Sequence, residues 1–91
     1  MIKENKIITK ISIIIPTLNE SINLPLLLSD LSEIYNRSEI LVIDSTSTDK
    51  TKDIALINGT RFYKINKNNR GLQLNYGAEK AKGEWLSLIH I

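Results

Sequence analysis

The chain has 91 residues, of which 42% are hydrophobic and 24% charged, and its formal net charge is +2. These values fit one small globular domain and argue against a disordered chain. The absence of cysteine excludes disulfides, thiolate catalysis and cysteine-based zinc sites. No dense Lys/Arg block is present, so nucleic acid is not expected as the main partner. Lys64, Lys67 and Arg70 are spread among asparagines and are interpreted as a solvated loop, with a phosphate-binding patch as the alternative.

The first ten residues are polar and rich in lysine. Because they contain no apolar h-region, they do not resemble a signal peptide. No apolar run reaches the roughly 18 residues that are needed to span a bilayer. We therefore expect a cytoplasmic protein without a transmembrane segment, in which residues 1–10 precede a domain over residues 11–91.

The first half of the chain predicts two strands with a helix between them. Residues 11–15 (ISIII) are β-branched and nearly all apolar, which is typical of a strand covered on both faces. We expect Pro16 to end this strand, because proline cannot donate to a sheet ladder. Apolar residues at helical spacing from Leu24 to Tyr35 then predict a helix with one buried stripe. Residues 39–44 (EILVID) predict the second strand.

The next segment predicts another helix and strand. The polar residues 45–48 offer several N-caps for a helix over residues 49–58, which Gly59 should end as a C′ glycine. Residues 61–65 (RFYKI) predict the third strand.

A third helix is expected over residues 71–82, with Gly83 as its stop, and residues 85–91 (WLSLIHI) predict a fourth strand. The order β-α-β-α-β-α-β favours an α/β fold with a doubly wound parallel sheet. Ligands of such sheets bind at the carboxyl ends of strands, near the point where strand order reverses. The loops after the first, second and fourth strands are therefore the candidate sites.

Polar side chains follow the first strand. Thr17, Asn19 and Glu20 place three hydrogen-bonding groups at its carboxyl end, where N–H groups of the following helix also point. A capped turn, to which Asn19, Ser21 and Asn23 would contribute, is the alternative explanation.

The second strand ends on Asp44, where an apolar segment meets a polar turn. A carboxylate here can accept hydrogen bonds from a ribose hydroxyl or a base N–H, so we expect a ligand role. In the alternative, Ser47 or Thr48 caps the next helix and Asp49 complements its dipole. That alternative leaves Asp44 unexplained, because a strand-terminal carboxylate gains little from the dipole.

The third helix opens with Arg70 and Gly71, a suitable place for a cation near a diphosphate. Gln73 and Asn75 follow. Gly77, in the helix interior, costs about 1 kcal/mol relative to alanine. Close approach of another backbone would explain it, and a surface helix that tolerates glycine is the alternative.

Three strings, SIIIPTLNE, EILVIDSTSTDKT and NRGLQLNYGAEKAKGEWLSLIH, resemble in order and spacing the family 2 glycosyltransferases of the GT-A fold. The resemblance extends from Ile11 to His90 and points especially to the bacterial transferase 2 subgroup associated with radical-SAM and selenium-related genes. The motifs of dinucleotide-binding dehydrogenases, P-loop nucleotidases and nucleophile-elbow hydrolases are absent from the sequence.

This resemblance implies the amino-terminal, nucleotide-binding half of a GT-A (Rossmann-like) domain, with a nucleotide-diphosphate sugar as donor. It also implies which residues bind that donor: Pro16, Thr17, Asn19 and Glu20 line the pocket, Asp44 with the adjacent Ser45 lies at the base or ribose, and Arg70, Gln73 and Asn75 lie where the donor-facing helix begins.

Two departures from the family pattern stand out. Many members carry two adjacent aspartates and then Gly-Ser, whereas here Ser45 replaces the second aspartate and Thr46 takes the glycine position. Thr46 would resist the positive φ that glycine accepts. In the family, the fourth strand leads into an Asp-containing motif that holds Mg²⁺ or Mn²⁺, and His90 matches a histidine at the strand end. We therefore expect neither metal ligands nor a catalytic base within the chain.

Three hypotheses remain open. The chain is a glycosyltransferase fragment that is inactive alone for want of a metal site and a base. Alternatively, it is a non-catalytic nucleotide-binding module, or the partner of a separately encoded carboxyl-terminal half. A third hypothesis is an aggregating remnant, because the fourth strand would leave an apolar edge.

Overall fold

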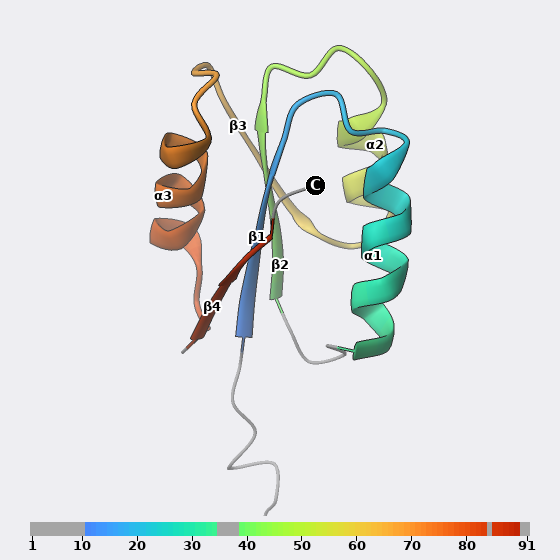
Figure 1. Cartoon of the computed structure of the whole chain (residues 1–91), viewed down its shortest axis with the longest axis vertical. Helices are drawn as coiled ribbons and strands as arrows, with labels where there is room; N and C mark the ends of the chain where they lie inside the picture. Colours follow the sequence, from blue (N-terminus) through green and yellow to red (C-terminus); the bar gives the residue numbers. More distant parts are fainter. Residues whose placement is uncertain (1–10, 35–38, 84, 90–91) are drawn as a thin grey trace, which may run out of the picture.

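The computed structural model of this chain describes residues 11–34, 39–83 and 85–89 (Figure 1). The polar segment 1–10, the end of the first helix at Tyr35 and the last strand residues, His90 and Ile91, lie outside this part of the chain.

Four parallel strands form one sheet in the order β3-β2-β1-β4. The strands are β1 (Ile11–Thr17), β2 (Glu39–Ser45), β3 (Arg61–Ile65) and β4 (Trp85–Leu88). Successive strands move outward from β1 to β3, and β4 then returns to the other side of β1, so strand order reverses between β1 and β4.

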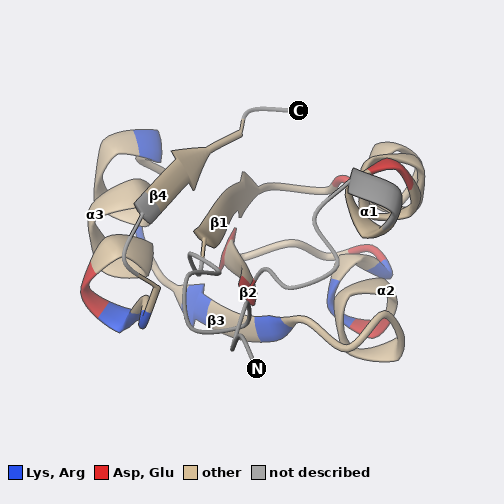
Figure 2. Ribbon diagram, turned by 90° about the horizontal axis from the view of Figure 1, so that it is seen from below, with Lys and Arg blue, Asp and Glu red and all other residues tan. Residues whose placement is uncertain are grey.

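Helices cover both faces of this sheet. As Figures 1 and 2 show, α1 (Asn23–Ile34) and α2 (Thr51–Ile57) lie on one face and α3 (Arg70–Lys80) on the other. The doubly wound α/β fold expected from the sequence is thereby confirmed. None of the described helices is long and apolar enough to cross a membrane.

The core has two layers because alternate residues of the central strands point to opposite faces. Ile13, Ile15 and Val42 pack with the leucines of α1 and with Ala55 of α2. Ile14, Leu41 and Ile43 pack on the α3 side. This two-sided burial explains why both strand sequences are nearly continuous apolar runs.

Gly77 is where α3 comes closest to the sheet. A Cβ at this position would lie 2.5 Å from Cγ2 of Ile14 and 3.1 Å from Cγ1 of Ile43. The sequence analysis offered close approach of another backbone, whereas the atoms nearest to this glycine belong to the side chains of Ile14 and Ile43.

The expectation that Pro16 ends the first strand is wrong, because β1 continues to Thr17 and Pro16 pairs with Ile43. The Ile14 carbonyl accepts the Ile89 N–H at 3.1 Å on the β4 side. Backbone groups alternate along a strand, so the nitrogen of Pro16 also faces the β4 side. There it lies beyond the last described β4 pair, Ile14 with Leu88, where it has no ladder hydrogen bond to lose.

Gly83 is not the stop of α3, which ends at Lys80. The backbone leaves the helix earlier because polar groups at the amino ends of the strands bind it. The Lys82 N–H donates to Glu39 Oε1 at 2.9 Å, and the Gly83 N–H donates to Ser12 Oγ at 2.8 Å. Burial raises the pKa of Glu39, but hydrogen bonds from Lys82, Ser12 and Arg61 outweigh it and hold that pKa below 4.5.

The other element ends differ by a few residues from the sequence expectation. α2 begins at Thr51 after an N-cap, Lys50, that makes no side-chain capping bond, and it ends before Gly59 (φ +77°), as expected of a C′ glycine. β4 ends at Leu88 among the described residues.

Candidate functional site

A small cleft opens where the carboxyl end of β1 meets the amino end of α3. Its volume is about 150 Å³, and it is lined by Pro16, Thr17, Leu18, Glu20, Asn68, Arg70 and Gln73. β1 is one of the two strands that flank the reversal of strand order, which is where open α/β sheets bind their ligands. Five residues selected from the sequence thus lie together: Pro16, Thr17, Glu20, Arg70 and Gln73.

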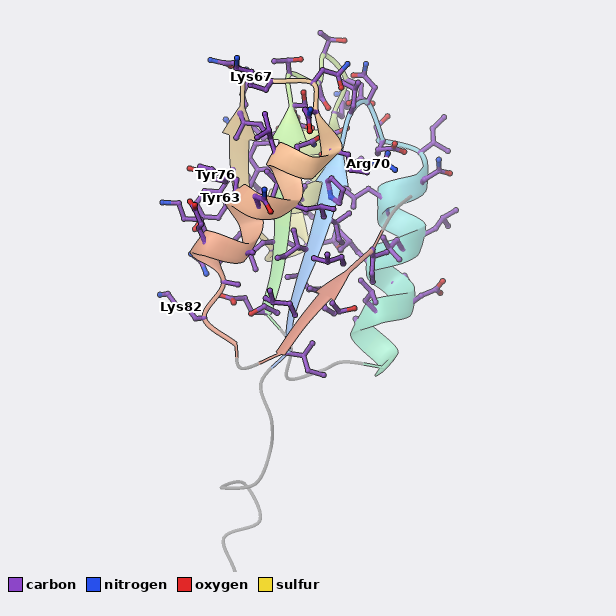
Figure 3. The ribbon with its side chains drawn as sticks, turned by 60° about the vertical axis from the view of Figure 1, so that its left-hand side comes forward. Tyr63, Lys67, Arg70, Tyr76 and Lys82 are labelled. Atoms are coloured by element: carbon purple, nitrogen blue, oxygen red, sulfur yellow. The ribbon has the colours of Figure 1, made fainter. Side chains whose placement is uncertain are left out.

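The first turn of α3 supplies the positive end of a helix dipole to this cleft. Asn69 is the N-cap, and its Oδ1 accepts the Leu72 N–H at 3.0 Å. Arg70 is the first helical residue, and in Figure 3 it lies at the amino end of α3, away from Lys67. A guanidinium beside exposed helix N–H groups is suited to an anionic ligand.

Gln73 is buried and fastens α3 to the sheet. Its Nε2 donates to the Thr17 carbonyl at 3.1 Å and to the Ile43 carbonyl at 2.8 Å. Both amide hydrogens are therefore used at the carboxyl ends of β1 and β2. Gln73 lines the cleft, and it also fixes the distance between Arg70 and the strand ends.

Asp44 differs from the solvent-facing carboxylate that the sequence analysis expected. It is only 2% exposed, and three protein donors occupy its carboxylate. Thr17 Oγ1 and Ser47 Oγ donate to Oδ1 at 2.6 and 2.5 Å, and the Ser47 N–H donates to Oδ2 at 2.8 Å. Asp44 thus ties the end of β1 to the loop after β2, and it does not line the cleft.

Asn19 joins the same two loops from the other side. Its N–H donates to Ser47 Oγ at 2.7 Å, and its Oδ1 accepts the Thr48 N–H at 2.8 Å. Asn19 has a φ of +55°, a conformation that asparagine tolerates better than most residues. Ser47 and Thr48 therefore bind the neighbouring loop, and the alternative in which one of them caps α2 is wrong.

A third link uses Asp49 and Thr51. The Thr51 hydroxyl donates to Asp49 Oδ1 at 2.5 Å and accepts the Glu20 N–H at 2.9 Å. Asp49 also accepts the N–H groups of Thr51 and Ser21, both at 3.0 Å. The Thr51 hydroxyl is the main cause that lowers the pKa of Asp49 from 3.8 to about 2.

Ser45 and Asn75 lie outside the cleft. The buried Ser45 donates from Oγ to the Lys67 carbonyl at 2.7 Å and so holds the loop between β3 and α3. Asn75 lines a different hollow beside β3. Thr46 has a φ of +57°, which confirms that a position typical of glycine is occupied here by a β-branched residue.

Sequence reasoning missed two residues that line the cleft, Leu18 and Asn68. Leu18 lies between two polar residues that were selected, and Asn68 lies in the loop interpreted as solvated. Their position next to Thr17 and Arg70 was the only available signal. Among the described residues, no group of three or more His, Cys, Asp or Glu side chains could hold a metal ion.

Residues 12–90 match the sequence profile described as Glycosyl transferase family 2. The chain belongs to this family. It is 39% identical, over an alignment of 96 residues, to an uncharacterised glycosyltransferase of Rickettsia typhi, covering 96% of this chain and 28% of that protein. It is also 39% identical over 69 residues to the 4,4'-diaponeurosporenoate glycosyltransferase of Staphylococcus haemolyticus, covering 76% of this chain and 18% of that protein. The chain therefore spans less than a third of the length of these relatives.

Solved structures show the same fold. Glucosyl-3-phosphoglycerate synthase from Mycobacterium tuberculosis, crystallised with Mn²⁺, UDP and glucosyl-3-phosphoglycerate, has a TM-score of 0.79 at 24% identity. The match covers 90% of this chain and 33% of that one. The crystal structure of the same synthase with Mg²⁺ and UDP has a TM-score of 0.77 at 22% identity, with the same coverage of each chain. At this identity the likeness establishes the GT-A fold of the chain.

Proposed function

We propose that this chain binds the nucleotide-diphosphate part of a sugar donor in the cleft between β1 and α3, as the donor-binding portion of a glycosyltransferase. The observation that carries the proposal is the meeting of Arg70 and the α3 amino end with the polar carboxyl end of β1 in one cleft. A cation and the positive end of a helix dipole favour a diphosphate. Thr17 and Glu20 then lie on the side that would meet the nucleoside.

The ligand class is supported by the solved relatives, which hold UDP together with Mn²⁺ or Mg²⁺. The described residues of this chain offer no cluster that could hold such an ion. Binding as proposed here therefore relies on Arg70, the helix end and the β1 loop.

The residues in this proposal have two roles, ligand contact and positioning. Arg70, Thr17 and Glu20 contact the nucleotide. Asp44 and Gln73 position them, because one holds the Thr17 hydroxyl and the other spans the carbonyls of both strand ends. The assignment of Asp44 as a direct ligand is replaced here by this supporting role, since its carboxylate already accepts three hydrogen bonds.

Amide ¹⁵N–¹H NMR of the chain with UDP or GDP tests the proposal. We expect the peaks of Thr17, Glu20 and Gln73 to shift on titration. Arg70→Ala should weaken binding about tenfold, the effect of losing a charge-assisted contact of about 1.4 kcal/mol. Lys67→Ala is the matched control, since this exposed cation of the same loop does not line the cleft, and its effect should stay below about twofold. A spectrum that is unchanged by either nucleotide, or an equal loss in both variants, would refute the proposal.

A non-catalytic binding module would give the same titration, and so would a chain that pairs with a separately encoded half. A transfer assay with UDP-glucose separates these possibilities from an active enzyme. We expect no turnover by the chain alone, and sugar transfer by the purified chain would contradict its assignment as a binding portion.

The subgroup of the chain rests on the sequence strings alone. We include in the proposal its membership of the transferase 2 subgroup associated with radical-SAM and selenium-related genes. We also include the cytoplasmic location expected in the sequence analysis. The NRGLQLNYG string that opens α3 is the main support for the subgroup.

A further inference from the structure

A second hollow lies between β3 and α3, and we call it the β3–α3 slot. It measures about 270 Å³ and is lined by Ile65, Lys67, Leu72, Asn75, Tyr76 and Glu79. It shares no lining residue with the cleft, and in Figure 3 Lys67 and Tyr76 lie on the side of α3 away from Arg70. Ile65, Leu72 and Tyr76 give it a partly apolar lining, which suits a single apolar side chain of a partner.

The lining of the slot combines an apolar floor with a basic rim. Leu72 is 46% exposed although it is a large apolar residue in a helix. Lys67 lies at the rim, and Lys80 holds its Nζ 5.4 Å from the centre of the Tyr76 ring. Lys82 extends from the same edge of the molecule (Figure 3).

The charges at this edge favour an acidic partner. Among the lining residues the exposed Lys67 and Glu79 balance each other in charge, and the exposed Lys80 and Lys82 beside the slot give this edge its basic excess. A surface with an excess of one charge attracts ligands of the opposite sign and raises their rate of association. A concave slot also fits a projecting side chain better than the flat surface of a membrane.

The strand beside the slot indicates the form of the partner. β3 is the last strand of the sheet among the described residues, and it pairs only with β2. An extended segment can pair with the outer edge of such a strand, and its alternate side chains then pass over one face. Tyr63 and Ile65 of β3 belong to the apolar cluster on the α3 side, which is the face of the slot.

We propose that the β3–α3 slot docks an acidic, extended peptide segment of a partner protein. The segment lies beside β3, its acidic residues face Lys67, Lys80 and Lys82, and one apolar side chain enters the slot beside Leu72 and Tyr76. This interaction is independent of the donor cleft, because Asn75, rather than Arg70 or Gln73, lies on this side of α3.

The test uses the fluorescein-labelled peptide GETLTEG, whose leucine and two glutamates lie on the same face of an extended chain, with the ¹⁵N-labelled chain. We expect the amide peaks of Ile65, Leu72 and Tyr76 to shift, and the fluorescence anisotropy to give an affinity that weakens as salt is added. Leu72→Asp should weaken binding by about fivefold or more, as for a residue at the centre of an interface. Lys67→Glu should have an effect of similar size, because it reverses a rim charge that attracts the peptide. Lys52→Glu makes the same charge change on an exposed residue of α2, and its effect should stay below about twofold.

Several results would overturn the proposal. These are no binding by GETLTEG, equal binding of the basic peptide GKTLTKG, or equal losses in Lys52→Glu and Lys67→Glu. Shifts of the same peaks produced by phosphatidylglycerol vesicles or single-stranded DNA, but not by the peptide, would assign the surface to a membrane or a nucleic acid instead. Concentration-dependent shifts without peptide would assign it to a second copy of the chain. A dispersed amide spectrum shows that each variant is folded, so a loss of binding reports on the surface.

Discussion

Replacing Gly77 with alanine sets helix propensity against packing. Alanine favours the helical state by about 1 kcal/mol relative to glycine in an exposed helix. Here the added Cβ would lie 2.5 Å from Cγ2 of Ile14, whereas carbon atoms in contact lie about 3.5–4.0 Å apart. Ile14 and Ile43 are both fully buried, so neither side chain has room to rotate away. Either α3 moves outward by about 1 Å or the two strands are displaced.

Overpacking of this kind costs about 1–3 kcal/mol. After the propensity gain is subtracted, we expect Gly77→Ala to lower the free energy of unfolding by up to about 2 kcal/mol. In a domain of this size that corresponds to a fall in Tm of up to about 16 °C, measured by circular dichroism. An outward shift of α3 would also lengthen the Gln73 hydrogen bonds and weaken nucleotide binding.

Gly71→Ala is the matched control within the same helix. A Cβ there meets only the end of the exposed Asn69 side chain, at 3.2 Å. We expect its Tm to stay within about 4 °C of the original, equivalent to less than about 1 kcal/mol. A Tm of Gly77→Ala at or above that of the unmodified chain would refute the claim that α3 is held against Ile14.

Three further changes test other parts of the argument. Thr46→Gly should raise the free energy of unfolding, measured by urea denaturation, by about 0.5–1 kcal/mol. The left-handed conformation costs a residue with a Cβ about 1–2 kcal/mol, and glycine avoids part of that cost. A loss of stability would contradict this prediction. Asp49, with its pKa lowered from 3.8 to about 2, adds stability above pH 3.8 that is lost as the pH falls toward 2. In Asp49→Asn the urea midpoint should therefore fall less steeply across that window, and an unchanged slope would contradict this. Gln73→Leu leaves two strand carbonyls without their donor, so it should lower the free energy of unfolding by about 1–3 kcal/mol and weaken UDP binding. If stability and UDP affinity were both unchanged, these bonds would not hold the cleft.

Most of the fold follows from sequence patterns that depend on neighbouring residues. The nearly continuous apolar runs 11–15 and 39–44 predicted two strands, because burial on both faces leaves little room for polar residues. Gly59 marked the end of α2 through its positive φ. The predicted element ends were wrong where residues distant in the sequence determine the local structure. At Gly83, for example, Glu39 and Ser12 of the sheet bind the turn after α3.

The candidate site was predictable only in part for the same reason. Thr17, Glu20 and Arg70 could be selected because strand order and helix polarity alone place them at one edge of the sheet. An aspartate at position 44 suits direct ligand binding and support of a neighbouring loop equally well. Its donors, Thr17 and Ser47, lie 27 and 3 residues away, and only the register of β1 with β2 brings the first of them within 2.6 Å.

The cleft is thus bordered by loops that are already fixed to one another. Asp44, Asn19 and Thr51 each join the loop after β1 to the loop after β2, and Gln73 joins both strand ends to α3. A ligand that enters such a cleft orders few additional groups, so a larger share of its contact energy is retained as affinity. Thr46, which has a strained φ, lies in the same loop. Such strain persists where the surrounding hydrogen bonds hold the backbone in one conformation. The polar residues that made the sequence look like a binding site therefore serve it mainly by holding Thr17, Glu20 and Arg70 in place.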